Sequence, residues 1–114
     1  MVKMKEKAEL SDEGLEMIAY RFRQLADPMR LKILHTLGDG EMNVTDLVKA
    51  TGAGQANVSK HLGTLLNAQI VVRRKDGLNA IYRVSDETIF ELCEVVCSSL
   101  KNQLKTRHNA LLGL

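Results

Sequence analysis

Apolar side chains recur at helical spacing in five segments of the chain, and each segment predicts a helix. The first helix is expected over residues 11–25, because Ser11 is a suitable N-cap. Asp27 and Pro28 predict the start of the second, since aspartate caps a helix and proline suits its first position, and Gly38 ends it. The apolar positions of these two helices are Leu15, Ile18, Ala19, Phe22, Leu25, Leu31, Ile33, Leu34 and Leu37.

Two short helices follow with only a tight turn between them. Asn43, with Asp46 three residues later, predicts the cap of a third helix, which Gly52 ends. The fourth helix is expected over residues 55–67, and its apolar positions face inward. This pairing is a helix-turn-helix pattern. The second of the two helices leaves polar side chains on its free side, namely Gln55, Asn57, Ser59, Lys60 and Thr64.

After residue 69 the period of the apolar positions changes. Residues 70–75 and 79–84 are predicted to be two strands, joined at Asp76-Gly77, a dipeptide that favours a two-residue hairpin turn. A terminal helix is expected over residues 86–107, with a long apolar stripe that so small a domain has little core to cover. The stripe predicts a homodimer seam and consists of Ile89, Leu92, Cys93, Val96, Cys97, Leu100 and Leu104. The expected class is mainly α with a small β-hairpin, in the order α-α-α-α-β-β-α.

Length and composition bound the organisation of the chain. A chain of 114 residues, 45% apolar, suits one domain that is marginal as a self-sufficient monomer. We expect a flexible N-terminal arm over residues 1–10, the domain over 11–107 and a C-terminal tail over 108–114. No stretch approaches the roughly 18 apolar residues of a membrane span, so a cytoplasmic protein without membrane contact is expected. Cys93 and Cys97 are four apart on one helix, too far for an easy disulfide, which suits a reducing compartment.

Charge is distributed unevenly along the chain. Residues 47–75 contain no Asp or Glu, and residues 84–100 contain no Lys or Arg. The acid-free stretch covers the fourth helix and the first strand of the hairpin, and its overlap with a helix-turn-helix pattern favours a surface for an anion such as duplex DNA. Its basic residues are Lys49, Lys60, Arg73, Arg74 and Lys75.

Three segments of the sequence resemble one family. Residues 25–34 read LADPMRLKIL, residues 58–62 read VSKHL with Leu65 following, and residues 73–77 read RRKDG with Tyr82 following. In this order they resemble the ArsR/SmtB family of bacterial metal- and redox-responsive repressors, over about residues 11–105. The resemblance implies a winged helix-turn-helix homodimer, joined through its terminal helices, that acts as a transcriptional repressor. Gly54 and Asn79 depart from the family pattern, which usually has Ser and often Arg at these positions.

The expected DNA-facing residues have different predicted roles. Gln55 and Asn57 lie near the start of the recognition helix and are the candidates for base edges, since both side chains can pair bidentately with adenine. His61 is open between a phosphate contact and a structural hydrogen bond. A two-fold dimer predicts an imperfect palindrome in the DNA, with half-sites about one helical turn apart. The candidates for contacts with the phosphate backbone are Ser59, Lys60, Thr64, Arg73, Arg74 and Lys75.

Two inducer sites that the ArsR/SmtB family uses are missing from this sequence. Asn43 and Thr45 stand where its arsenic-type C-x-C site has thiols, and no histidine lies between residues 62 and 107 for its terminal-helix zinc site. The remaining effector candidates are Cys93, Cys97 and His35. These residues could bind a thiophilic metal or metalloid such as arsenite or Zn²⁺, within one protomer or across two. The cysteines could instead sense oxidants as a thiol pair, or pack as small apolar residues.

The favoured prediction is a regulator that binds specific sequences of duplex DNA and is released by an inducer at the cysteines. An enzyme is not expected, because the three histidines are scattered and no glycine-rich phosphate loop or acid/base pair is present. Two alternatives are a constitutive regulator whose cysteines only pack, and a winged-helix interaction module without DNA binding. The absence of acid from residues 47–75 argues against the module, since a surface without phosphate contacts has no reason to exclude carboxylates.

Overall fold

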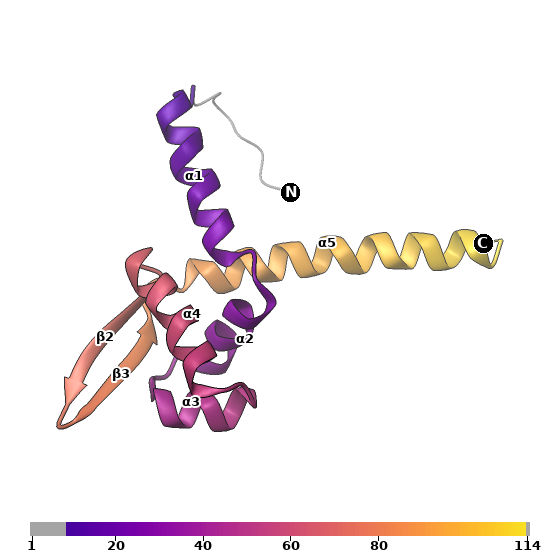
Figure 1. Ribbon diagram of the computed structural model, residues 1–114. Helices are drawn as coiled ribbons and strands as arrows, with labels where there is room; N and C mark the ends of the chain where they lie inside the picture. Colours follow the sequence, from indigo (N-terminus) through magenta and orange to yellow (C-terminus); the bar gives the residue numbers. More distant parts are fainter. Residues whose placement is uncertain (1–8, 114) are drawn as a thin grey trace.

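A computed structural model describes residues 9–113 of the chain. The middle helices and a small sheet form the body of the protein, and the first and last helices project from it in different directions (Figure 1). This architecture confirms the predicted class, mainly α with a small β-hairpin. The elements in order are α1 (Asp12–Leu25), α2 (Pro28–Leu37), β1 (Met42–Asn43), α3 (Val44–Thr51), α4 (Gln55–Asn67), β2 (Val71–Asp76), β3 (Asn79–Val84) and α5 (Thr88–Leu111).

Side-chain caps start the first three helices where the sequence predicts. The Ser11 hydroxyl accepts a hydrogen bond from the backbone of Gly14 at 3.0 Å. The Asp27 carboxylate accepts two backbone hydrogen bonds at the start of α2, and Asn43 accepts one from Asp46 at 2.8 Å. Such caps satisfy the backbone N–H groups that a helix start leaves free. Gly52, with φ of 72°, ends α3 in the left-handed conformation that glycine adopts without strain.

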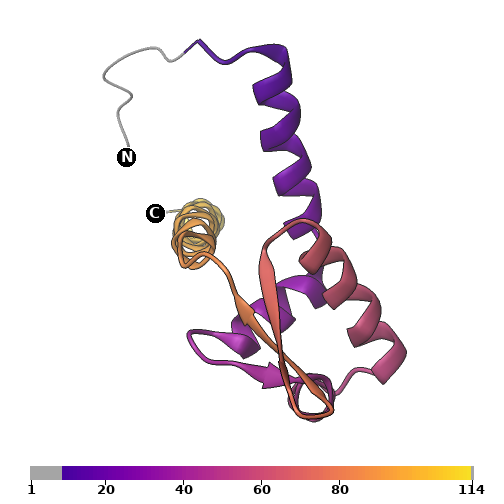
Figure 2. The ribbon, with the colours of Figure 1, turned by 90° about the vertical axis from the view of Figure 1, so that its left-hand side faces the viewer.

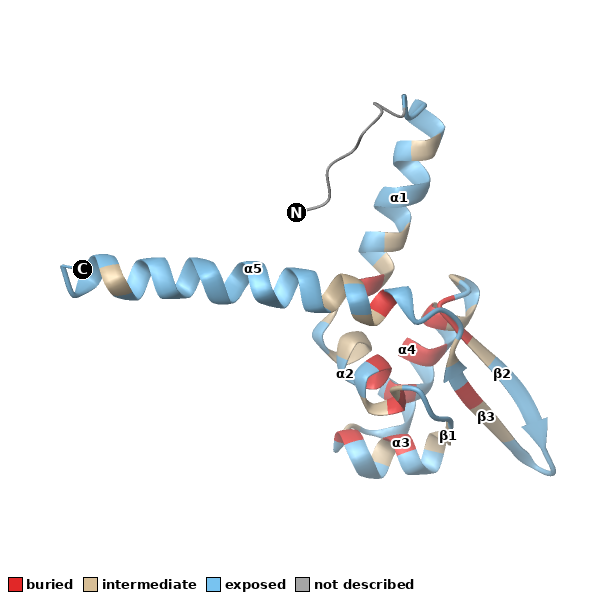
Figure 3. Ribbon diagram, turned by 180° about the vertical axis from the view of Figure 1, so that it is seen from behind, coloured by how far each residue is buried: buried red, intermediate tan, exposed pale blue. Residues whose placement is uncertain are grey.

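The hydrophobic core lies between α2, α3, α4 and the base of the sheet (Figure 3). Val58, Leu62 and Leu65 on α4 are all buried, as their spacing predicts. Ile89 is the buried apolar residue through which α5 joins this core. The remaining members of the core are Leu25, Ile33, Leu34, Leu37, Leu47, Ile70, Val71 and Tyr82.

The sheet has three antiparallel strands in the order β1-β3-β2. β2 and β3 form the predicted hairpin, and its turn lies at the opposite end of the molecule from the free end of α1 (Figures 1 and 2). β1 was not predicted, because a strand of two residues is too short to show an alternating pattern. Met42 pairs with Tyr82 and so ties the hairpin to the start of α3.

The ends of α5 differ from the prediction. The helix begins at Thr88, where the Asp86 carboxylate accepts a backbone hydrogen bond at 3.0 Å. It continues to Leu111, so residues 108–111 are helical and not part of a tail. The prediction of a helix end at residue 107 was wrong because no glycine or proline follows until Gly113. Most of the expected N-terminal arm, residues 1–8, lies outside the described residues.

Most of both projecting helices is exposed to solvent (Figure 3), and the exposed residues include large apolar ones. Phe22 on α1 is 51% exposed, and Leu100 and Leu104 on α5 are 53% and 62% exposed. The Cα radius of gyration is 17.7 Å, against about 13 Å for a compact domain of this length. A single protomer therefore leaves these apolar faces uncovered. None of the helices over the described residues is long and apolar enough to cross a lipid bilayer.

Candidate nucleic-acid interface

The outward face of α4 is polar and uncovered. Gln55 and Asn57 are both exposed in the first turn of the helix, and Ser59 and Lys60 are exposed in the next. The opposite face of α4 is the buried one, so the core fixes which side chains point outward. The exposed polar face lies at the helix start, where side chains of a major-groove helix reach base edges.

The N-terminus of α4 carries no side-chain cap. Gly54 occupies the N-cap position, and no side-chain hydrogen bond is made there. The first backbone N–H groups of α4 therefore stay free to face an anion, and the helix dipole favours negative charge at this end. A free helix start beside exposed amide side chains is a suitable surface for a phosphate backbone.

The three basic residues of β2 are not equivalent. Alternation along β2 puts Arg73 and Lys75 on one face of the strand and Arg74 on the other. All three are exposed, but within residues 9–113 only Arg74 forms an ion pair. Arg73 and Lys75 are thus the cations of β2 that are available to an anion, and they border a hollow of about 440 Å³ near the turn.

Arg74 is held by Glu41, which precedes β1. The guanidinium donates through Nη2 to Oε1 of Glu41 at 2.5 Å and through Nε to Oε2 at 3.2 Å. These hydrogen bonds lower the pKa of Glu41 below its usual value and raise that of Arg74. The sequence analysis missed Glu41, because it is 33 residues from Arg74 and no local pattern joins them.

His61 is buried at 8% exposure, on the inner face of α4. Its Nε2 lies 3.9 Å from Oδ1 of Asp27, the residue that caps α2. Burial of this side chain argues against a phosphate contact, but no structural hydrogen bond of His61 is seen either, because Nδ1 has no partner among the described residues and Nε2 makes only this longer contact. Thr64 is half-buried, and its hydroxyl donates to the carbonyl of Lys60 at 3.3 Å. Thr64 therefore stays a weaker candidate for a phosphate contact than Ser59 or Lys60.

The effector candidates line one groove. It has a volume of about 670 Å³ and lies between the end of α1, α2 and α5, with mostly apolar walls. Cys93 is half-buried and Cys97 exposed, and both are free thiols. Nδ1 of His35 lies 2.8 Å from the carbonyl of Leu31. A carbonyl only accepts, so Nδ1 is the donor in this hydrogen bond.

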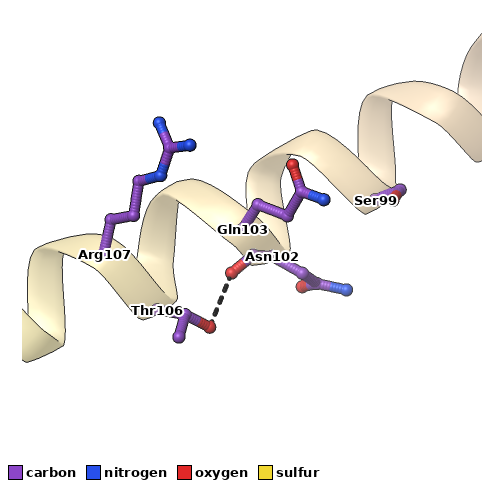
Figure 4. Close-up of a pocket in the computed structure, with 5 residues that line it drawn as sticks. All are labelled: Ser99, Asn102, Gln103, Thr106 and Arg107. Carbon is purple, nitrogen blue, oxygen red and sulfur yellow. Dashed lines mark hydrogen bonds between the residues drawn. The ribbon is translucent and has the colours of Figure 1, made fainter.

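The three candidates do not form a metal site within one protomer. The described residues contain no group of three or more His, Cys, Asp or Glu side chains that could hold a metal ion. Within the described part of one protomer, the structure therefore does not bring Cys93, Cys97 and His35 together as three donors. A second hollow runs along the outer part of α5 and is lined by amide, hydroxyl and guanidinium groups of that helix alone (Figure 4). It offers no thiol or imidazole, and its lining residues are Ser99, Asn102, Gln103, Thr106 and Arg107.

An exposed recognition helix next to a basic two-stranded wing defines a winged helix-turn-helix protein. A family model described as "Bacterial regulatory protein, arsR family" matches residues 27–72. The regulator KmtR of Mycobacterium tuberculosis is 36% identical over 83 residues, which are 73% of this chain and 64% of KmtR. A "Probable mercury resistance operon repressor" of Streptomyces lividans is 39% identical over 71 residues, 62% of this chain and 57% of the relative. The chain thus spans about three fifths of these two relatives.

Solved structures give the same assignment. The crystal structure of Mycobacterium tuberculosis Rv0081 has a TM-score of 0.75 at 33% identity and covers 85% of this chain and 98% of its own. The homodimeric DNA-binding domain Mb0332 of Mycobacterium bovis has a TM-score of 0.71 at 29% identity and covers 87% of this chain and 94% of its own. The protein belongs to the arsR family of bacterial regulatory proteins.

Proposed function

We propose that this protein is a homodimeric transcriptional repressor that binds specific sequences of duplex DNA. The observation that carries the proposal is the surface formed by the start of α4 and the hairpin. Exposed amides on α4 and the free cations Arg73 and Lys75 stand in a stretch without any carboxylate from residue 47 to residue 75. Amides can read base edges while cations neutralise phosphates, so one surface holds both components of specific binding.

The roles within this surface follow from position. Gln55 and Asn57 at the helix start read bases in the major groove, each bidentate pair with adenine adding about 1–3 kcal/mol of discrimination. Lys60 on α4 contacts the phosphates that flank the groove, together with Arg73 and Lys75 on the wing. Arg74 contributes less in this arrangement, because its charge is already paired with Glu41. Ser59 supplements the phosphate contacts by a neutral hydrogen bond.

The homodimer forms through α1 and α5. These helices expose the apolar side chains that the body of one protomer does not cover, including Phe22, Leu100 and Leu104. The similar Mb0332 domain is described as homodimeric, which supports the same assembly here. A two-fold dimer presents two copies of α4, and the DNA site should then be an imperfect palindrome with half-sites about one helical turn apart.

Titration of salt against a random-sequence duplex tests DNA binding without knowledge of the target site. The logarithm of the binding constant should fall linearly with that of the salt concentration, with a slope of about −0.9 per neutralised phosphate. Arg73→Ala should make this slope shallower. Lys105→Ala, which removes an exposed cation from the remote part of α5, should leave it unchanged. A flat salt dependence for the unmodified protein would contradict DNA binding and favour an interaction module.

The effector, in this proposal, is a thiophilic metal or metalloid such as arsenite or Zn²⁺ that binds Cys93 and Cys97. Arsenite needs three thiolates, so two protomers must combine their cysteines across the dimer. The absence of a three-donor group within the described part of one chain favours this shared arrangement. Support also comes from the mercury resistance repressor among the relatives. Metal binding would stabilise a conformation with poorly spaced recognition helices and so release DNA.

Titration of the anaerobically reduced protein–DNA complex separates the effector alternatives. Arsenite or Zn²⁺ should release DNA from the unmodified protein and not from Cys93→Ser or Cys97→Ser. His35→Gln tests whether the imidazole adds a ligand. Release by peroxide or persulfide, with no response to arsenite or Zn²⁺, would show that the cysteines act as a thiol switch and not as a metal site. No response to any of these agents would assign the cysteines to packing.

A further inference from the structure

We infer that Asp27 and His61 form a positioning contact that sets the orientation of the recognition helix and couples it to the groove. The inference rests on the proposed function, since it concerns how α4 is held for DNA reading. The contact joins Oδ1 of Asp27, at the junction of α1 and α2, to Nε2 of His61 on the inner face of α4 at 3.9 Å. Neither residue touches the outward face of α4, so both act on DNA through the position of the helix.

Few other polar contacts hold α4 in place. Over residues 9–113 it is the one polar side-chain contact between α4 and another helix. Gly54 supplies no side-chain cap, so the start of α4 has no tether of its own. The rest of the buried face of α4 is apolar and consists of Val58, Leu62 and Leu65. Apolar contacts are non-directional, whereas the Asp27–His61 contact brings two particular polar atoms together and so favours one rotation of α4.

Asp27 is itself held rigidly at its own position. One carboxylate oxygen accepts the backbone N–H groups of Met29 at 2.8 Å and Arg30 at 3.1 Å. The hydrogen bond from Arg30 is the main cause that lowers the pKa of Asp27, and the charge of His61 lowers it further. The carboxylate is therefore charged near neutral pH, and the start of α2 fixes its direction toward His61.

The same junction forms one wall of the groove. Leu25 and Ala26, which directly precede Asp27, line it opposite Cys93 and Cys97. α2, which begins at the Asp27 cap, contributes Leu31 and His35 to another wall. An occupant that moves these walls must move Asp27, because the cap and the lining residues are consecutive in the chain. The contact then passes the displacement to α4 through a single side-chain pair.

The hydrogen-bonding groups around the Asp27–His61 contact are not all paired. Nδ1 of His61 and Nε of Arg30 are both buried, and in the described part of the chain neither has a hydrogen-bond partner. Unpaired buried polar atoms cost free energy, so this arrangement is less stable than a complete network. If a change at the groove moves α4 through this pair, DNA binding must act back on the groove by the same factor.

Asp27→Asn breaks the charge contact and keeps the helix cap, since asparagine caps helices as well as aspartate does. With His61→Gln and the double variant it forms a complete cycle. The control is Asp86→Asn, which makes the same exchange at the start of α5, where the carboxylate bonds to the backbone of Thr88 and not to α4. The readouts are affinity for a duplex selected from a random pool, affinity for random duplex, hydrogen exchange of the α4 amides and thermal unfolding.

Each single variant should lose about three- to tenfold affinity for the selected duplex, the size expected for one ordinary polar contact. Affinity for random duplex should stay within about twofold, and the double variant should lose no more than either single variant. Hydrogen exchange of α4 should rise while Asp86→Asn leaves it unchanged. Equal losses on both duplexes, additive effects in the double variant, or unchanged exchange in α4 would overturn the inference.

The two proposals fail in different ways. If even the unmodified protein shows no salt-dependent binding to duplex, the DNA-binding function is wrong. Hydrogen exchange of α4 in Asp27→Asn and His61→Gln then still decides whether the contact positions the helix. If His61→Gln does not fold, His61→Asn provides a second neutral side chain with a hydrogen-bond donor. Reduced sensitivity of DNA release to arsenite in Asp27→Asn, with Cys93 and Cys97 intact, is expected if the contact carries the coupling.

Discussion

Arg73 and Arg74 are adjacent in the sequence, but their charges serve different purposes. Arg73 points from the wing without a carboxylate partner among the described residues, whereas Arg74 is clamped by Glu41 across the sheet. An exposed ion pair of this kind contributes little to stability, and its main effect is to reduce the charge available to an anion. Composition alone counts both residues as DNA contacts.

Arg73→Ala should therefore reduce the salt slope of DNA binding by about one per protomer, because a free cation that neutralises a phosphate is removed. Arg74→Ala should change the slope by less than half as much. Glu41→Gln should raise affinity for random duplex, since it frees the guanidinium. Fluorescence anisotropy at several salt concentrations measures all three. Equal slope changes for the two arginine variants would show that Glu41 does not hold Arg74 when DNA is bound.

The carboxylate of Asp27 gives a pH-dependent contribution to stability. Its pKa in the folded protein lies below the ordinary value of 3.8, mainly through the backbone hydrogen bond from Arg30. A depressed pKa stabilises the fold above the ordinary value, and this stabilisation is lost as the pH falls through the lower, folded-state pKa. The stability difference between Asp27→Asn and the unmodified protein should be present at pH 6 and shrink below pH 3.8.

Urea unfolding at a series of pH values measures this difference. Asp46→Asn is the control, because Asp46 is exposed and its carboxylate makes no hydrogen bond or ion pair with another described residue. A difference for Asp27→Asn that does not change with pH would show that the cap, and not its charge, carries the stabilisation.

Helix starts were the most predictable elements, because local caps decide them. Ser11, Asp27 and Asn43 all make the capping hydrogen bonds that the sequence indicates. β1 and the end of α5 could not be predicted in the same way. β1 exists only because Met42 and Asn43 lie beside β3, a contact between distant segments. The last turn of α5 has no local stop signal before Gly113.

Gly54→Ser should stabilise the protein by a few tenths of a kcal/mol, because a serine hydroxyl can cap the first N–H groups of α4. A Cβ at Gly54 meets no other atom within 4 Å, and the backbone φ of −69° suits any residue. Gly52→Ser is the matched control two residues earlier. It should destabilise by about 1–2 kcal/mol, because Gly52 has a φ of 72°.

Urea unfolding at fixed protein concentration measures both glycine variants. The same pair also probes the free N-terminus of α4, since a serine cap competes with phosphate for the same N–H groups. A gain in stability at Gly52→Ser would contradict the left-handed conformation that ends α3.

A single protomer leaves large apolar surfaces of the molecule exposed to solvent. α1 and α5 project from the body with their apolar faces in solvent, and the Cα radius of gyration exceeds that of a compact domain. The sequence indicated a seam on α5 from the length of its apolar stripe. The sequence could not indicate which of the candidate DNA-facing side chains are buried in the folded protein. His61 is one such side chain, and its burial depends on packing between helices that are distant in the chain.

Leu100→Glu should convert the dimer to a monomer, because a charge on the apolar stripe of α5 must be desolvated in a dimer. Ser99→Glu adds the same charge one residue away, on the polar face of the helix (Figure 4), and should leave the dimer intact. Sedimentation velocity at micromolar concentration measures the assembly. A dimer that persists in Leu100→Glu would show that the dimer interface does not include this face of α5.

The most direct test of the account compares two substitution sets on two DNA molecules. Gln55→Ala and Asn57→Ala should weaken binding to the selected duplex by about 1–3 kcal/mol per lost bidentate pair and leave binding to random duplex nearly unchanged. Arg73→Ala should weaken both alike, because it removes a phosphate contact that carries no sequence information. Equal losses on the two duplexes for all three variants would contradict the division between base reading by α4 and backbone binding by the wing.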